Sequence, residues 1–181
     1  RCKGMKSSAK NDFVMPIAVL TMICLVITAL LALTNSATEP VITKAALERA
    51  EAARSEIIPE AEGFELVEAE ALPSTVTEVY RTTNEVGYIF MLTTIGYGGE
   101  MDLICGIDED GRIIAVKTLA HSETKGMGSK TTEEPFRSQF IGKDASLEGV
   151  NAITGATISS KAYLGAIADA FTAYEIVKGE E

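Results

Sequence analysis

An uncharged apolar run of 21 residues, from Phe13 to Leu33, constrains this chain more than any other feature. As a helix rising about 1.5 Å per residue, the run would be roughly 30 Å long, which matches the hydrocarbon core of a bilayer. A helix of a soluble core seldom contains so long a stretch without a charge. The apolar part of a cleaved signal peptide, the nearer alternative, is usually about 7–15 residues long, and no clean cleavage site follows this run. We therefore predict an uncleaved transmembrane helix over residues 13–35.

The distribution of charge predicts the orientation of this helix. Residues 1–12 contain four of the 16 basic side chains but only one of the 26 acidic ones. By the positive-inside rule, this basic tail lies in the cytoplasm and the rest of the chain lies outside the cell (inner) membrane. The formal net charge of −10 also argues against nucleic acid as a partner, because an acidic domain repels the phosphate backbone.

The cysteines and the histidine exclude several kinds of redox site. The three cysteines are scattered, and no pair has the spacing of a metal site or a redox motif. Cys105 lies in an apolar stretch, where we expect a small buried side chain. Since His121 is the single histidine, a haem or zinc site with several histidine ligands is excluded. We predict no metal site, so a redox cofactor would need another kind of attachment.

After the apolar run, the sequence pattern indicates a series of shorter helices and strands. A polar segment over residues 34–43, which includes Pro40, is expected to lead away from the membrane helix to a second helix that ends at Pro59. The middle of the chain is rich in β-branched and aromatic residues bounded by turn signals. These patterns predict four strands, over residues 76–83, 86–95, 102–107 and 112–119.

Turn chemistry indicates how the strands are connected. Asn84-Glu85 is a turn-like pair, and Asp108–Gly111 has the Asp and Gly residues of a hairpin turn, where Gly supplies the positive φ. Much of both faces of the strands is apolar, which predicts a sheet covered by helices.

Two helices are expected after the strands. Thr131 and Glu134 have capping-box spacing and predict a short helix. A long helix is expected to begin at Ser159 or Ser160 and to end at Gly179. Its apolar stripe consists of Tyr163, Ile167, Phe171, Tyr174 and Val177.

The order of elements predicts the α+β class: one N-terminal transmembrane helix, then a single domain with an antiparallel sheet flanked by helices. The expected boundaries are a basic tail over 1–12, the membrane helix over 13–35, a linker and helical segment over 36–75, and the domain over 76–181.

The segment Asn151–Ser160 is a loop of small residues that leads directly into the long helix. Gly155 and Ala156 allow a bulky group to approach the backbone, and the first turn of a helix offers free N–H groups to a phosphate. The physical features are compatible both with such a site and with an ordinary helix cap that binds nothing.

The run Thr154-Gly155-Ala156-Thr157 resembles the Ser/Thr-Gly-Ala-Thr flavinylation motif of FMN-binding domains. These domains occur in the G subunit of the Rnf ion-translocating electron-transport complex and in the C subunit of the sodium-pumping NADH:quinone reductase. The motif often has Asp where this chain has Asn151. The resemblance implies that a flavin transferase esterifies the phosphate of FMN to the hydroxyl of Thr157.

Two further segments carry the resemblance. His121–Gly128 is similar to a His-x-Glu-Thr-x-Gly-Leu-Gly stretch that lies beside the flavin in the family, and Gly96-Tyr97-Gly98-Gly99 precedes the second hairpin in a similar way. His121 and Glu123 could also be loop residues bonded to backbone, and Tyr97 could be a core residue. The implied cofactor-binding residues are Tyr97, His121, Glu123, Thr124, Gly128, Thr154, Gly155, Ala156, Ser159 and Ser160.

The resemblance implies an electron-transfer subunit of an Rnf-type ferredoxin:NAD oxidoreductase, with covalent FMN on the extracytoplasmic side. Its partners would be the other subunits of the complex, the membrane and the flavin transferase. No residue of the chain is expected to be catalytic by itself. The alternatives are the C subunit of the quinone reductase and a non-redox flavin-binding scaffold or sensor.

Overall fold

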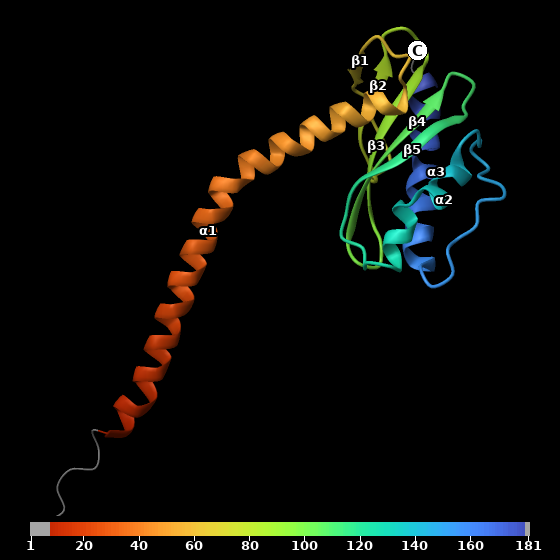
Figure 1. Ribbon diagram of the computed structural model, residues 1–181. Coiled ribbons are helices and arrows are strands. Elements are labelled where there is room, and N and C mark those ends of the chain that lie inside the picture. The colour runs from red at the N-terminus through yellow and green to blue at the C-terminus, as the bar shows by residue number, and fades with distance from the viewer. Residues whose placement is uncertain (1–7, 180–181) are drawn as a thin grey trace, which may run out of the picture. The chain divides into compact units, whose positions relative to one another are not determined.

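The computed structural model describes residues 8–179 (Figure 1). The chain forms two compact units, one ending at Glu48 and the other beginning at Arg49, and each is described by itself. The helices are α1 (Ser8–Ile57), α2 (Glu134–Arg137) and α3 (Thr157–Gly179), with 3-10 turns η1 (Gly128–Thr132) and η2 (Ser138–Phe140). The strands are β1 (Phe64–Val67), β2 (Val76–Thr82), β3 (Gly87–Ile95), β4 (Glu100–Asp108) and β5 (Ile113–His121).

The first unit is formed by the N-terminal part of α1. Within the described residues, α1 is the one helix whose length and composition would let it cross a membrane. Contrary to the predicted polar exit, α1 continues without interruption through residues 34–43 and includes Pro40. An interior proline removes one backbone hydrogen bond. The helix-favouring Ala, Leu and Glu residues that follow can outweigh this loss.

The second unit is built on an antiparallel sheet with the strand order β1-β2-β3-β4-β5. The four predicted strands are confirmed, and both turns form as expected. The Oδ1 atom of Asp108 accepts hydrogen bonds from the backbone N–H groups of Asp110 and Arg112, and Gly111 has a φ of +74°. Sequence reasoning missed β1, because it is only four residues long and acquires its strand conformation by pairing with β2.

Helices cover both faces of the sheet, which confirms the predicted fold class (Figure 1). All five residues of the apolar stripe of α3 are buried against one face, together with Phe90 and Leu103. On the other face, Ala53 and Ile57 at the end of α1 pack against Ile89 and Ile104.

The end of α1 is also held to the sheet by polar contacts. The ammonium of Lys117 forms an ion pair with Glu56, and the guanidinium carbon of Arg54 lies 4.1 Å from the centroid of the Tyr80 ring. The last turns of α1 are therefore part of the core of the second unit.

Cys105 lies inside the sheet and is fully buried, as predicted. Burial raises the pKa of its thiol, because the thiolate would have to exist in an apolar environment. The thiol is therefore protonated and has the packing role of a small apolar side chain.

The helices α2 and α3 begin at other residues than the sequence predicted. The hydroxyl of Thr131 donates to the carbonyl of Gly128 at 2.8 Å, so it does not cap α2, and the capping-box prediction is wrong. The residue before α2 is Glu133, and its side chain makes no capping hydrogen bond. The helix α3 begins at Thr157, earlier than the predicted Ser159, because the carbonyl of Ala156 already accepts from the N–H of Ser160.

The packing of α1 on the sheet can be tested at Gly106. A Cβ atom at this position would lie 2.4 Å from Cγ2 of Ile57, so the substitution Gly106→Ala has to displace the Ile57 side chain, the end of α1 or the strand. We expect it to lower the free energy of unfolding by about 1–3 kcal/mol, as overpacking commonly does. The measurement is denaturant unfolding of the full chain in detergent.

The matched control for that substitution is Gly165→Ala. Gly165 is exposed on α3, and a Cβ atom added there would have nothing within 4 Å, so alanine should stabilise the helix by roughly 0.5–1 kcal/mol. If Gly106→Ala were as stable as the wild type, the close contact between α1 and β4 would be contradicted.

Candidate functional site

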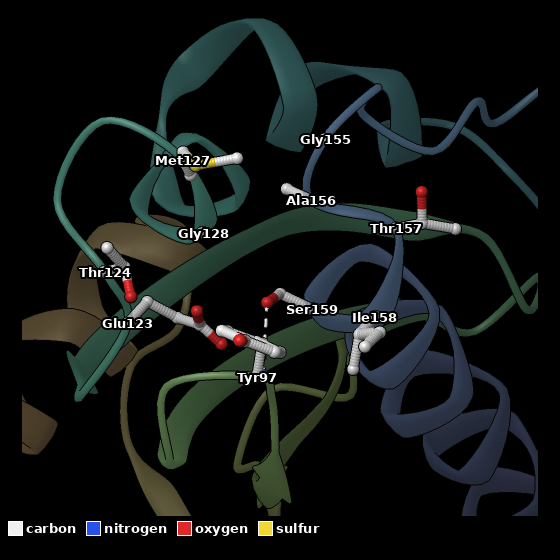
Figure 2. Close-up of a pocket in the computed structure, with 10 residues that line it drawn as sticks. All are labelled: Tyr97, Glu123, Thr124, Met127, Gly128, Gly155, Ala156, Thr157, Ile158 and Ser159. Atoms are coloured by element: carbon white, nitrogen blue, oxygen red, sulfur yellow. Dashed lines mark hydrogen bonds between the residues drawn. The ribbon is translucent and has the colours of Figure 1, made fainter.

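A cavity of about 390 Å³ lies where three segments of the second unit meet (Figure 2). The segments are the loop between β3 and β4, the loop between β5 and η1, and the start of α3. This volume is within the range of small-molecule sites. The cavity is lined by Tyr97, Glu123, Thr124, Met127, Gly128, Gly155, Ala156, Thr157, Ile158 and Ser159.

The loop before α3 is held in place by its own backbone. Gly155 has a φ of +86°, a conformation that glycine adopts far more easily than other residues. The N–H of Ala156 donates to the carbonyl of Ile153 at 3.0 Å, and the N–H of Ile153 donates to the hydroxyl of Ser160, also at 3.0 Å. These bonds fix the loop to the first turn of α3 and leave Thr157 exposed at the edge of the cavity.

The N-terminus of α3 forms one wall of the cavity. Its first backbone bond joins the N–H of Ser160 to the carbonyl of Ala156. The N–H groups of Thr157, Ile158 and Ser159 therefore precede the first acceptor available within the helix. Such N–H groups and the positive end of the helix dipole favour a phosphate.

A hydrogen bond joins α3 to the loop between β3 and β4. The hydroxyl of Ser159, which is fully buried, accepts from the backbone N–H of Tyr97 at 3.3 Å (Figure 2). The Tyr97 side chain itself is 73% exposed, so it is not a core residue. Together with the exposed side chains of Met127 and Ile158, it places apolar surface around the cavity.

Glu123 contributes a buried carboxylate. The residue is only 8% exposed, and its Oε2 atom accepts from the backbone N–H of Gly98 at 3.3 Å. Its Oε1 atom has no hydrogen-bond partner within the part of the chain that the structure describes. A buried acceptor without a partner is rare in folded proteins, because desolvation of the oxygen is then not compensated.

His121 lies next to this carboxylate in the sequence but does not line the cavity. Its side chain is exposed, and its Nδ1 atom accepts from the backbone N–H of Glu123 at 3.2 Å. The histidine is therefore hydrogen-bonded to the backbone, which is one of the two roles that the sequence left open for it.

Most of the residues predicted to bind the cofactor come together at the cavity. Eight of them line it, counting Thr157, whereas Thr154, Ser160 and His121 do not. Sequence reasoning missed Ile158. Ile158 could have been recognised as an apolar residue that lies outside the buried stripe of α3. In the structure it is 59% exposed.

Metal ligands are not grouped in this structure. Among the described residues, no three His, Cys, Asp or Glu side chains lie close enough together to hold a metal ion. The residues that line the cavity offer apolar walls, hydroxyl groups, one carboxylate and the N-terminus of α3.

Comparison with known proteins connects this cavity to a family. Residues 96–172 match the FMN-binding domain family, and this range contains all three segments that form the cavity. The chain is 33% identical to the G subunit of the ion-translocating oxidoreductase complex of Methanosarcina acetivorans over 175 residues, which cover 88% of this chain and 93% of that protein.

A second relative is the G subunit of the Na⁺-translocating ferredoxin:NAD⁺ oxidoreductase complex of Acetobacterium woodii. It is 32% identical over 185 residues, with 87% of this chain and 89% of the relative covered. The G subunit of the proton-translocating ferredoxin:NAD⁺ oxidoreductase complex of Clostridium ljungdahlii is 32% identical over 95 residues, which cover 47% of this chain and 51% of that protein. Because the similarity to the first two relatives extends over nearly the whole of both chains, the chain belongs to the family of Rnf-type G subunits of ion-translocating oxidoreductases.

Proposed function

We propose that this protein is an electron-transfer subunit of an Rnf-type complex and that it carries FMN covalently on Thr157. The observation that carries the proposal is the position of Thr157. It is the first residue of α3, at the edge of the cavity and directly after the small residues Gly155 and Ala156. The relatives named above are G subunits, which favours this assignment over the C subunit of the quinone reductase.

The residues of the cavity fit FMN. The N-terminus of α3 suits the phosphate, and the exposed apolar side chains of Tyr97, Met127 and Ile158 suit the faces of an aromatic ring system. The unpaired oxygen of Glu123 suits an N–H or O–H donor of the bound group. When bound, FMN supplies the electron-accepting chemistry, and the chain contributes binding, orientation and charge.

The resemblance to flavinylated domains implies that the covalent bond forms by transfer of FMN from FAD to Thr157. The Oγ1 atom of Thr157 forms a bond to the phosphorus of the FMN half of FAD. The bond between the two phosphates of FAD breaks, AMP leaves, and the proton of the hydroxyl is released. A flavin transferase catalyses this step. An ester bond of this kind retains the flavin whatever its affinity for an open site.

The attachment is tested with the full chain produced together with a flavin transferase. In a denaturing gel, the wild type should give a fluorescent flavin band, and Thr157→Ala should reduce it to background because no hydroxyl remains to be esterified. Thr157→Ser, which keeps a hydroxyl, should retain the band. The matched control is Thr172→Ala, which removes an exposed threonine from the same helix.

Two results would contradict the attachment at Thr157. One is a wild-type band that persists in Thr157→Ala, which would move the attachment elsewhere. The other is an unlabelled wild type whose intact mass equals that of its amino acids, which would favour a non-redox scaffold.

The proposed orientation places the FMN domain on the extracytoplasmic side and the basic tail in the cytoplasm. Supporting observations are the excess of basic residues before the apolar segment and the acidic excess after it. This arrangement can be tested with the native thiol Cys2 and an introduced thiol, Thr172→Cys. Cys105 does not interfere because it is fully buried, and Cys24 lies within the apolar segment.

A membrane-impermeant maleimide added to intact cells should label Thr172→Cys, whereas Cys2 should react only after the cells are permeabilised. The reverse pattern would show that the domain is cytoplasmic. The single-thiol forms are made by replacing the other reactive thiol with serine.

A further inference from the structure

We infer that Glu123 accepts a hydrogen bond from an N–H group of the flavin ring and thereby lowers the midpoint potential of the flavin. The inference rests on the proposed function, because it requires FMN in the cavity described above. It assigns to one residue of the chain the adjustment of the cofactor's potential.

The first argument is that burial of this carboxylate is energetically unfavourable for the fold. Glu123 is 8% exposed, one of its oxygens has no partner among the described residues, and none of the ten residues lining the cavity is a lysine or arginine. A buried charge without a cation or a complete set of hydrogen bonds destabilises a fold. Since the single bond from Gly98 could be accepted equally well by a glutamine, the fold alone does not account for an acid here.

The second argument is that the surrounding backbone is shaped around the carboxylate. A Cβ atom on Gly96 would lie 1.9 Å from Oε1 of Glu123, and a Cβ atom on Gly128 would lie 1.9 Å from Oε2. A Cβ atom on Gly98 would approach the Cα atom of Glu123 to 2.7 Å. The three glycines come from two segments, the loop between β3 and β4 and the start of η1, so the carboxylate occupies a space that only glycine at these positions leaves open.

The third argument is the direction from which a donor can arrive. Figure 2 shows Glu123 and Thr157 on opposite sides of the cavity, and both residues line it. A phosphate held at Thr157 and the N-terminus of α3 keeps its negative charge away from the carboxylate. The remaining donors of FMN are the ribityl hydroxyls and the N–H of the ring, of which the oxidised flavin has one. The ring is at the end of the molecule opposite the phosphate and therefore reaches furthest from Thr157.

Among the ten residues that line the cavity, the titratable side chains are those of Glu123 and Tyr97, and Tyr97 lies on the facing loop. Outside the cavity, His121 accepts from the backbone N–H of Glu123. The start of α3 contributes the hydroxyls of Thr157 and Ser159 and uncharged backbone N–H groups. The carboxylate is thus the one acidic side chain among the ten lining residues. A negative charge in a poorly solvated position disfavours the addition of electrons to a neighbouring ring, which lowers its potential.

The test compares Glu123→Gln with the wild type, using the flavinylated full chain. Glutamine preserves the shape of the side chain and removes its charge, and the titration follows only the chains that carry flavin. At a fixed applied potential, the ratio of reduced to oxidised flavin should rise by about tenfold in a spectroelectrochemical titration. The absorption spectrum of the oxidised flavin should shift, because a hydrogen bond to the ring changes.

The matched control is Glu100→Gln. Glu100 is exposed at the start of β4 and does not line the cavity, so its substitution changes the net charge equally and should leave the titration curve in place. If Glu123→Gln and Glu100→Gln give the same potential and the same spectrum as the wild type, the inference is overturned while the proposed function stands. A wild type that takes up no flavin overturns both.

A second variant moves the carboxylate and keeps its charge. In Gly128→Ala the new methyl group would lie 1.9 Å from Oε2 of Glu123, so the carboxylate has to shift. We expect a changed flavin spectrum, and we expect the double variant Gly128→Ala with Glu123→Ala to have a higher thermal midpoint than Gly128→Ala alone because the clash is gone. An unchanged spectrum in a loaded Gly128→Ala protein counts against contact between the carboxylate and the ring.

Discussion

Burial of the sheet on both faces is the constraint on which the rest of this structure depends. The apolar stripe of α3 fills one face, and the last turns of α1 fill the other. Once the stripe from Tyr163 to Val177 is packed, the start of α3 has a fixed position at one end of the sheet. The loop that precedes it then meets the connection between β3 and β4, and the bond between Ser159 and the N–H of Tyr97 joins them.

Glycines at the end of the sheet allow the loops around the cavity to adopt their observed conformation. Gly155 allows the positive φ of the loop before α3, whereas Gly96 and Gly128 leave room for the carboxylate of Glu123. A larger residue at any of these three positions would strain the loop or displace the carboxylate. The apolar side chains around it stay exposed, which is unfavourable for an isolated domain and suits a site that accepts an aromatic ring.

The two units contribute different parts of the proposed function. The long apolar part of α1 supplies the means of membrane attachment, and the second unit supplies the cavity. The two are continuous in sequence, because α1 extends from the first unit into the core of the second. An ester bond at Thr157 would make retention of FMN independent of how open the cavity is, which leaves room for electron exchange with neighbouring subunits.

The local features of this protein could be predicted from its sequence. The apolar run, the two hairpin turns, the four longer strands and the stripe of α3 each depend on residues close together in the chain, whose spacing reports their conformation directly. The family resemblance rested on similarly short motifs and was confirmed by relatives that align over most of the chain.

Other features were decided by contacts between residues far apart in the sequence. The strand β1 exists through its pairing with β2, and the room for the carboxylate of Glu123 depends on glycines in the loop between β3 and β4 and at the start of η1. Of the motif residues, Thr157 lines the cavity, whereas the hydroxyl of Ser160 accepts from the N–H of Ile153 and holds the loop. A sequence motif identifies the residue types that a site requires. Which of these residues contact the ligand, and which only stabilise the loop, depends on the direction of each side chain. That direction is set only when helix, sheet and loops pack together.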